Sequence, residues 1–98
     1  MPFALRLRHR HLLPLVPMNP EKVAELIRAG LPGAQVLVQS PDNTHFSARI
    51  VAQAFAGKRG IARHQLVYAT LGELVGREIH ALSIEAFTPD EWATRTNG

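Results

Sequence analysis

The sequence contains no cysteine. Disulfides are therefore excluded, and so is any metal site built only from this chain's own thiolates. No apolar run approaches the ~20 residues that a membrane-spanning helix needs. The Gly-x-Ser-x-Gly elbow that presents the nucleophilic serine of many hydrolases is also missing. These absences predict a non-enzymatic, cytoplasmic protein that makes no contact with membranes.

Acidic residues are absent from residues 1–17, which carry Arg6, Arg8 and Arg10. Subtracting these three from the 11 Lys and Arg leaves eight, which balance the eight Asp and Glu of residues 18–98. Such a neutral body is not expected to attract a nucleic-acid backbone strongly. We predict a mobile N-terminal extension over residues 1–17, where two prolines interrupt any helix, and one domain over residues 18–98. A transit peptide is the alternative for this arginine-rich start.

Hydrophobic periodicity and turn residues predict the order helix, strand, strand, helix, strand, helix. The expected elements are a helix from Asn19 to Gly30, strands at Gln35–Gln39 and Phe46–Gln53, a helix from about Ile61 to Leu74 stopped by Gly76, a strand at Ile79–Ala86, and a short helix opened by a capping box at Thr88–Glu91. The turn chemistry of Ser40–Thr44 predicts that the first two strands form an antiparallel hairpin. The sequence thus predicts a small α/β (α+β) domain.

Three histidines of the predicted domain are candidates for chemistry. His80 lies at the start of the third strand, and its side chain is expected on the same face as the apolar residues of that strand. The ring should then lie at the edge of the apolar face. One interpretation is a half-buried histidine bonded to backbone, and the other is an imidazole ligand with one free nitrogen. His45 starts the second strand beside the turn. His64 lies on or at the edge of a helical apolar face, and the spacing of the three matches no zinc motif.

Two further groups of residues could carry function. Asp42 and His45 form an acid–base pair in principle, although no pocket is evident around them. Gly57-Lys58-Arg59-Gly60 matches the Gly-x-x-Gly loop that clamps a nucleic-acid backbone in KH domains. Arg63 would extend the same basic patch one helical turn further. The alternative for this turn is an ordinary strand-to-helix connection with two solvated charges.

Five segments together resemble the BolA family, and more closely its short-loop, IbaG-like branch. The segments are Thr44-His-Phe46, Phe55-Ala-Gly57, Arg63-His-Gln-Leu-Val-Tyr68 followed by Leu71, Ile79-His-Ala-Leu-Ser-Ile84, and Thr88-Pro-Asp-Glu-Trp92. Their order and spacing are specific, and the resemblance runs from about Asn19 to Trp92. It implies a KH-like BolA fold in which three strands form a mixed sheet packed against helices.

The resemblance also implies a partner and a cofactor. Members of this family pair with monothiol glutaredoxins and share a [2Fe–2S] cluster, to which the partner and glutathione each supply a thiolate. The BolA-like chain supplies the histidine of its His-Ala-Leu motif, here His80. A second ligand comes from the loop between the first two strands as Cys or His. Here that loop is Ser40–Thr44 and has neither, so Asp42 or His45 are the candidate substitutes.

Other functions stay open at this stage. The family is linked to transcriptional regulation and stress responses, and Lys58, Arg59 and Arg63 are the residues that would contact DNA, weakly and in a salt-sensitive way. A small adaptor domain whose histidines only pack is the third hypothesis. A homodimer is also compatible with the sequence.

Overall fold

The computed structural model describes residues 18–97, so the predicted extension over residues 1–17 lies outside the described residues. The elements follow the predicted order, with two short 3-10 turns added. They are α2 (Pro20–Gly30), β1 (Gln35–Gln39), β2 (His45–Val51), η2 (Gln53–Phe55), α3 (Gly60–Leu71), η3 (Gly72–Leu74), β3 (Ala81–Phe87) and α4 (Pro89–Asn97). The α-β-β-α-β-α prediction is therefore confirmed.

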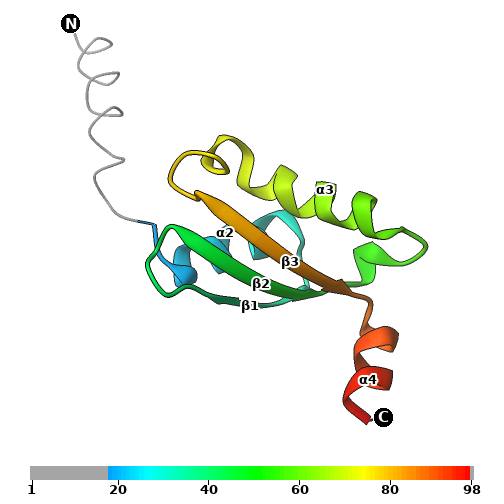
Figure 1. Ribbon diagram of the computed structural model, residues 1–98. Helices are drawn as coiled ribbons and strands as arrows, with labels where there is room; N and C mark the ends of the chain where they lie inside the picture. The colour runs from blue at the N-terminus through cyan, green and yellow to red at the C-terminus, as the bar shows by residue number, and fades with distance from the viewer. Residues whose placement is uncertain (1–17, 98) are drawn as a thin grey trace, which may run out of the picture.

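The three strands form one mixed sheet in the order β1-β2-β3. The β1–β2 pair is antiparallel, as the hairpin prediction required, and β3 runs parallel to β2. Helices α2 and α3 cover one face of this sheet, and α4 extends beyond the end of β3 (Figure 1). The core lies between the sheet and these two helices, and its fully buried large side chains are Phe55, Ile27, Ile50, Ile79, Val23 and Val67.

Helix α2 begins where the sequence has a capping residue followed by a proline, which are typical of a helix N-terminus. The Asn19 side chain accepts a hydrogen bond from the backbone N–H of Lys22 at 2.8 Å, and Pro20 occupies the first turn. Such a cap satisfies one of the N–H groups that a helix start leaves without an intrahelical partner. Val23 and Ile27 then fall on the buried stripe, one helical turn apart. At the far end, Gly30 lies against Thr70 of α3, where a side chain would not fit.

Helix α3 ends earlier than the sequence predicted. We expected helix to about Leu74 and a stop at Gly76, whereas the α-helix ends at Leu71. Gly72 has φ +57°, and this left-handed backbone breaks the α-helical hydrogen-bond ladder. A 3-10 turn continues to Leu74, so the periodicity alone could not separate the two forms. The helical period predicts Tyr68 on the apolar face of this helix, but it is 39% exposed.

Strands β2 and β3 are displaced slightly from their predicted ends. β2 begins at His45, one residue earlier than predicted, and ends at Val51. β3 begins at Ala81, because Ile79 is tied to the preceding turn by an N–H bond to the carbonyl of Leu74. His80 therefore lies on the connection just before the strand and is exposed. Its backbone N–H donates to the carbonyl of Thr44 at 2.7 Å, which fixes it beside the β1–β2 turn.

Candidate functional site

The β1–β2 turn is organised by Asp42. Its Oδ1 accepts hydrogen bonds from the backbone N–H groups of Thr44 (3.0 Å) and His45 (2.9 Å). Ser40 Oγ accepts another from the N–H of Asn43, which has φ +62°. The N–H of His45, then that of Thr44, then the His45 ring hold the pKa of Asp42 well below its usual range. The carboxylate is therefore ionised and fully engaged inside its own turn.

The ring of His45 is oriented by this carboxylate. Nδ1 lies 2.7 Å from Asp42 Oδ2 and 3.0 Å from Thr44 Oγ1. An ionised carboxylate can only accept a hydrogen bond, so Nδ1 carries the proton in this contact. The side chain is 57% exposed, and Nε2 has no hydrogen-bond partner among residues 18–97. Nε2 is thus left with its lone pair directed away from Asp42.

His80 reaches the same corner of the molecule from a different part of the chain. The parallel register pairs His45 with Ala81, which brings the residue before Ala81 next to the start of β2. The two imidazoles meet edge-on, with centroids 5.6 Å apart and planes at 64°. The His80 ring has no hydrogen bond within the described part of the chain and is exposed. The structure therefore brings together His80, His45 and Asp42.

These residues alone cannot complete a metal centre. Over residues 18–97, no group of three or more His, Cys, Asp or Glu side chains is arranged to hold a metal ion. His64 is half-buried on α3 and does not join the pair. The corner offers two imidazole nitrogens, so any metal bound here needs further ligands from another molecule. A shallow hollow of about 400 Å³, partly lined by His45, Ser47 and Ser83, adjoins the pair on the sheet surface.

The predicted basic patch divides into two parts. Lys58 and Arg59 are exposed in the turn before α3, where Gly57 has φ +75°. The side chain of Arg63 is only 13% exposed, and its guanidinium contacts both Glu91 oxygens at 2.6 and 3.0 Å. It also donates to the backbone carbonyls of Lys58 and Ala86. In this structure Arg63 therefore ties the turn, β3 and α4 together and lies outside the exposed basic surface.

The Arg63–Glu91 pair has a clear electrostatic signature. The hydrogen bonds that the Arg63 guanidinium donates to Glu91 raise the pKa of Arg63. Arg63, followed by the backbone N–H of Thr88, lowers the pKa of Glu91 to about 2. The second of these contacts belongs to the predicted capping box, in which Glu91 N–H also donates to Thr88 Oγ1 at 3.1 Å. The capping box is confirmed, while the tie to Arg63 could not be predicted because the partners are 28 residues apart.

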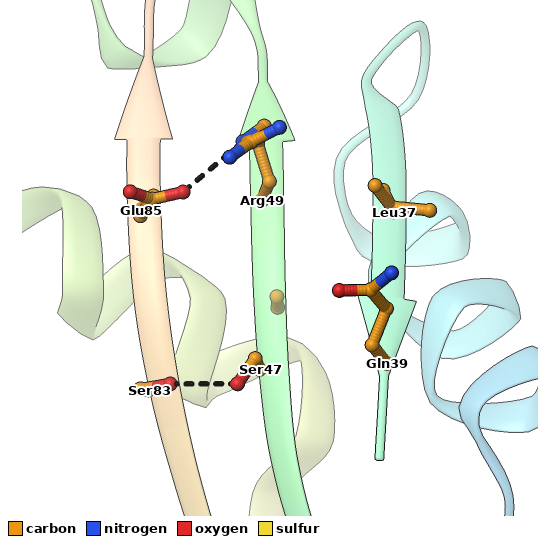
Figure 2. A pocket seen from close by; sticks show the side chains of 7 residues that line it. Leu37, Gln39, Ser47, Arg49, Ser83 and Glu85 are labelled. Carbon is orange, nitrogen blue, oxygen red and sulfur yellow. Dashed lines mark hydrogen bonds and ion pairs between the residues drawn. The ribbon is translucent and has the colours of Figure 1, made fainter. Parts of the chain in front are cut away.

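The sheet face opposite α2 and α3 is largely open, with Trp92 of α4 at one end, where its ring centroid is 5.0 Å from Arg49 Cζ. Figure 2 shows Leu37, Arg49 and Glu85 side by side across β1, β2 and β3, with Arg49 Nε 3.0 Å from Glu85 Oε1. A hydrogen bond joins Ser47 and Ser83 along the same seam. These side chains border a hollow of about 290 Å³. The signal for this face was the alternation of polar and apolar residues along the strands.

Comparisons with known proteins agree with this fold. Residues 29–91 match the family described as BolA-like protein. A protein of Acinetobacter guillouiae from the rpoN–murA intergenic region is 42% identical over 76 residues, which cover 76% of this chain and 90% of the relative. The structure of a BolA protein homologue from Coxiella burnetii is similar with a TM-score of 0.70 and 34% identity, covering 78% of this chain and 97% of that one.

A third relative is the DNA-binding transcriptional regulator BolA of Vibrio cholerae. It is 45% identical over 49 residues, which are 50% of this chain and 46% of the regulator. The matched segment therefore spans about half the length of that relative. Among the described residues, no helix is both long enough and apolar enough to cross a bilayer.

Proposed function

Because this chain belongs to the BolA family, we propose that it is a non-enzymatic partner protein that donates His80 to a shared [2Fe–2S] cluster. The ligands from outside this chain are a cysteine thiolate of a monothiol glutaredoxin and the thiolate of glutathione. The role that follows is cytoplasmic iron–sulfur cluster trafficking, iron homeostasis and stress response. The observation that carries the proposal is the exposed imidazole of His80 beside that of His45, in a chain with no thiolate of its own.

The separation of the two rings suits ligation of a single metal ion. An imidazole nitrogen lies about 2 Å from a bound metal, so the centroids of two rings on one tetrahedral metal are roughly 5 Å apart. The observed centroid separation is 5.6 Å, and neither ring is buried. Both side chains are exposed, so their rings can change rotamer without disturbing the core.

The donor chemistry fits an iron–sulfur cluster that is completed from outside. Clusters are held by thiolates, and where two histidines replace two cysteines on one iron the reduction potential rises. This chain offers imidazoles and no thiolates. It therefore fits one half of a cluster site whose sulfur ligands come from the partner and from glutathione. When bound, the cluster would supply the electron-transfer or iron-delivery chemistry, and the chain would supply its histidine ligation.

Within that site we assign His45 as the second ligand and Asp42 as its positioning residue. Histidines that bind metals commonly donate their other ring N–H to a carboxylate, which fixes the ring and makes the ligating nitrogen more basic. The Asp42 Oδ2 to His45 Nδ1 contact has this arrangement. Asp42 is a poorer ligand, because binding a metal would cost its hydrogen bonds to Thr44 and His45.

Reconstitution with a partner tests this proposal. The chain is mixed with a monothiol glutaredoxin that carries its glutathione-bound [2Fe–2S] cluster, and visible circular dichroism is recorded. The wild-type chain should change the spectrum, whereas His80→Ala should not. His64→Ala is the matched control, because His64 lies outside the histidine pair, and it should behave as wild type. If His80→Ala changes the glutaredoxin spectrum in the same way as the wild-type chain does, the proposal is wrong.

A DNA-binding role is the second candidate. Two observations favour it: the Vibrio cholerae relative is named a DNA-binding transcriptional regulator, and Lys58 and Arg59 are exposed in the turn before α3. The expected binding is weak and falls with salt, because few phosphates would be neutralised. A gel shift at two salt concentrations should show binding that Lys58→Ala/Arg59→Ala removes. Arg28→Ala, which changes an exposed charge on α2, is the control.

A further inference from the structure

Strand β1 leaves one edge of the sheet unprotected. It pairs only with β2, and no other backbone hydrogen bond is made by Gln35–Gln39 within residues 18–97. Natural proteins usually shield such an edge with charged side chains, proline or a bulge. β1 has none of these, and no charged residue occurs anywhere from Ala29 to Pro41. Leu37 at its centre is 52% exposed.

The opposite edge of the same sheet is treated differently. β3 carries Glu85 on its open face, paired with Arg49. Arg63 donates a hydrogen bond to the backbone carbonyl of Ala86, which occupies one acceptor of the strand. This contrast shows that the lack of protection is specific to β1 and is not a property of the whole sheet.

The sequence of β1 is a palindrome, Gln-Val-Leu-Val-Gln. We propose that β1 pairs antiparallel with β1 of a second copy of this chain, about a two-fold axis at Leu37. Leu37 then lies opposite its own counterpart, each Val36 opposite Val38 of the other copy, and each Gln35 opposite Gln39. All apolar residues face apolar residues, and the amides of the glutamines can hydrogen-bond to each other.

The lack of charge around β1 favours a second copy as the occupant. A two-fold interface sets each side chain against the same set of side chains, so a charge near the axis would meet its like. The uncharged stretch from Ala29 to Pro41 avoids that repulsion entirely. Such an interface is closed, because each of the two copies uses its β1 edge in the contact. The assembly therefore stops at a dimer. His80 is two strands away, next to the other edge, and stays exposed.

The proposed contact between the two β1 strands is small. A five-residue strand is about 17 Å long, and pairing along that length buries less than the roughly 1,200 Å² typical of stable complexes. We therefore expect a concentration-dependent dimer. Sedimentation velocity should show the wild-type chain, residues 1–98, shifting from monomer to dimer as its concentration rises to about 1 mM.

The absence of cysteine makes a register test possible. In antiparallel pairing the two Leu37 Cα atoms would be about 4.5–5.5 Å apart, within the roughly 4.4–6.8 Å that a disulfide spans. With diamide as oxidant, Leu37→Cys should therefore form a covalent dimer rapidly. Gln35→Cys should not, because the two Gln35 positions lie four residues apart along the strands, about 14 Å. Ile61→Cys is the exposure control, since Ile61 is 74% exposed on α3.

Two results support the proposal together and three would overturn it. Support requires crosslinking of Leu37→Cys at least tenfold faster than Ile61→Cys, and loss of the wild-type dimer in Leu37→Lys but not in Ile61→Lys. Equal crosslinking of Leu37→Cys and Ile61→Cys, or of Leu37→Cys and Gln35→Cys, contradicts the register. A wild-type chain that stays monomeric at the highest concentration means that residues 1–17 or nothing at all cover β1, and the proposal is then wrong.

Discussion

Asp42 holds the ring of His45 through a 2.7 Å contact between Oδ2 and Nδ1, three residues along the same turn. The substitution Asp42→Asn separates the two roles of this carboxylate, which are to accept backbone hydrogen bonds in the turn and to orient the His45 ring. The amide oxygen can still accept from the backbone N–H groups of Thr44 and His45, but the amide nitrogen cannot accept from Nδ1. We expect little loss of stability and a cluster complex that releases its iron about tenfold faster, the lower end of the effect of such outer contacts.

The tautomer of His45 provides an independent reading of the same contact. Long-range ¹H–¹⁵N correlation spectra of the isolated wild-type chain should show the proton of neutral His45 on Nδ1. In Asp42→Asn the Nε2–H form should become populated. If the wild-type ring already carries its proton on Nε2, Asp42 does not orient it. His64 serves as the internal reference, because Asp42→Asn does not change its surroundings.

Packing between α2 and α3 depends on Gly30. A Cβ at this position would lie 2.5 Å from Thr70 Cγ2 and 2.8 Å from Thr70 Cβ, so one of the helices must move. Gly30→Ala should therefore destabilise the fold by about 1–3 kcal/mol. Gly60→Ala is the matched control, because Gly60 begins α3 with no atom within 4 Å of a Cβ. Urea denaturation should show a lower midpoint for the first variant only.

Acid should weaken the fold through Glu91. Its pKa is about 2 in the folded chain against an ordinary value of 4.5, with Arg63 as the main cause. A lowered pKa stabilises the fold above pH 4.5, and that contribution is lost between about pH 4.5 and pH 2. Glu91→Gln should therefore be less stable than wild type at neutral pH, with a difference that shrinks across this window.

Thermal unfolding recorded from pH 7 to pH 2 measures this effect. Glu73→Gln is the control, because the Glu73 side chain is 93% exposed and lies 3.7 Å from Arg77. Its unfolding temperature should follow that of wild type at every pH. A constant gap between Glu91→Gln and wild type down to pH 2 would show that the Arg63–Glu91 pair does not respond to protonation of Glu91.

Much of the fold could be predicted because its signals are local. The Asn19 cap, the hairpin turn and the capping box at Thr88 each depend on residues within one helical turn or one loop. The early end of α3 was missed because Gly72 and Gly76 are equally good stop signals, and only the backbone shows that Gly72 adopts the left-handed conformation first. The exposure of Tyr68 was not predicted, because this residue lies at the margin of the buried stripe of α3.

The candidate site could be predicted only in part. His80 was identified by its motif, and Asp42 and His45 by their places in the turn. Their meeting depends on the parallel register of β2 and β3, which joins segments 36 residues apart and leaves no local trace. Arg63 was assigned to the basic surface because sequence spacing does not show where a long side chain points. Glu91, its actual partner, lies on another element.

The central claim is that an imidazole of this chain binds iron in the shared cluster. Pulsed electron paramagnetic resonance of the reduced heterodimer tests it most directly, with ¹⁵N-histidine incorporated only into this chain. We predict strongly coupled ¹⁵N signals that persist in His64→Ala and lose the His80 contribution in His80→Ala. A reduced cluster with no coupled histidine nitrogen from this chain would contradict the account.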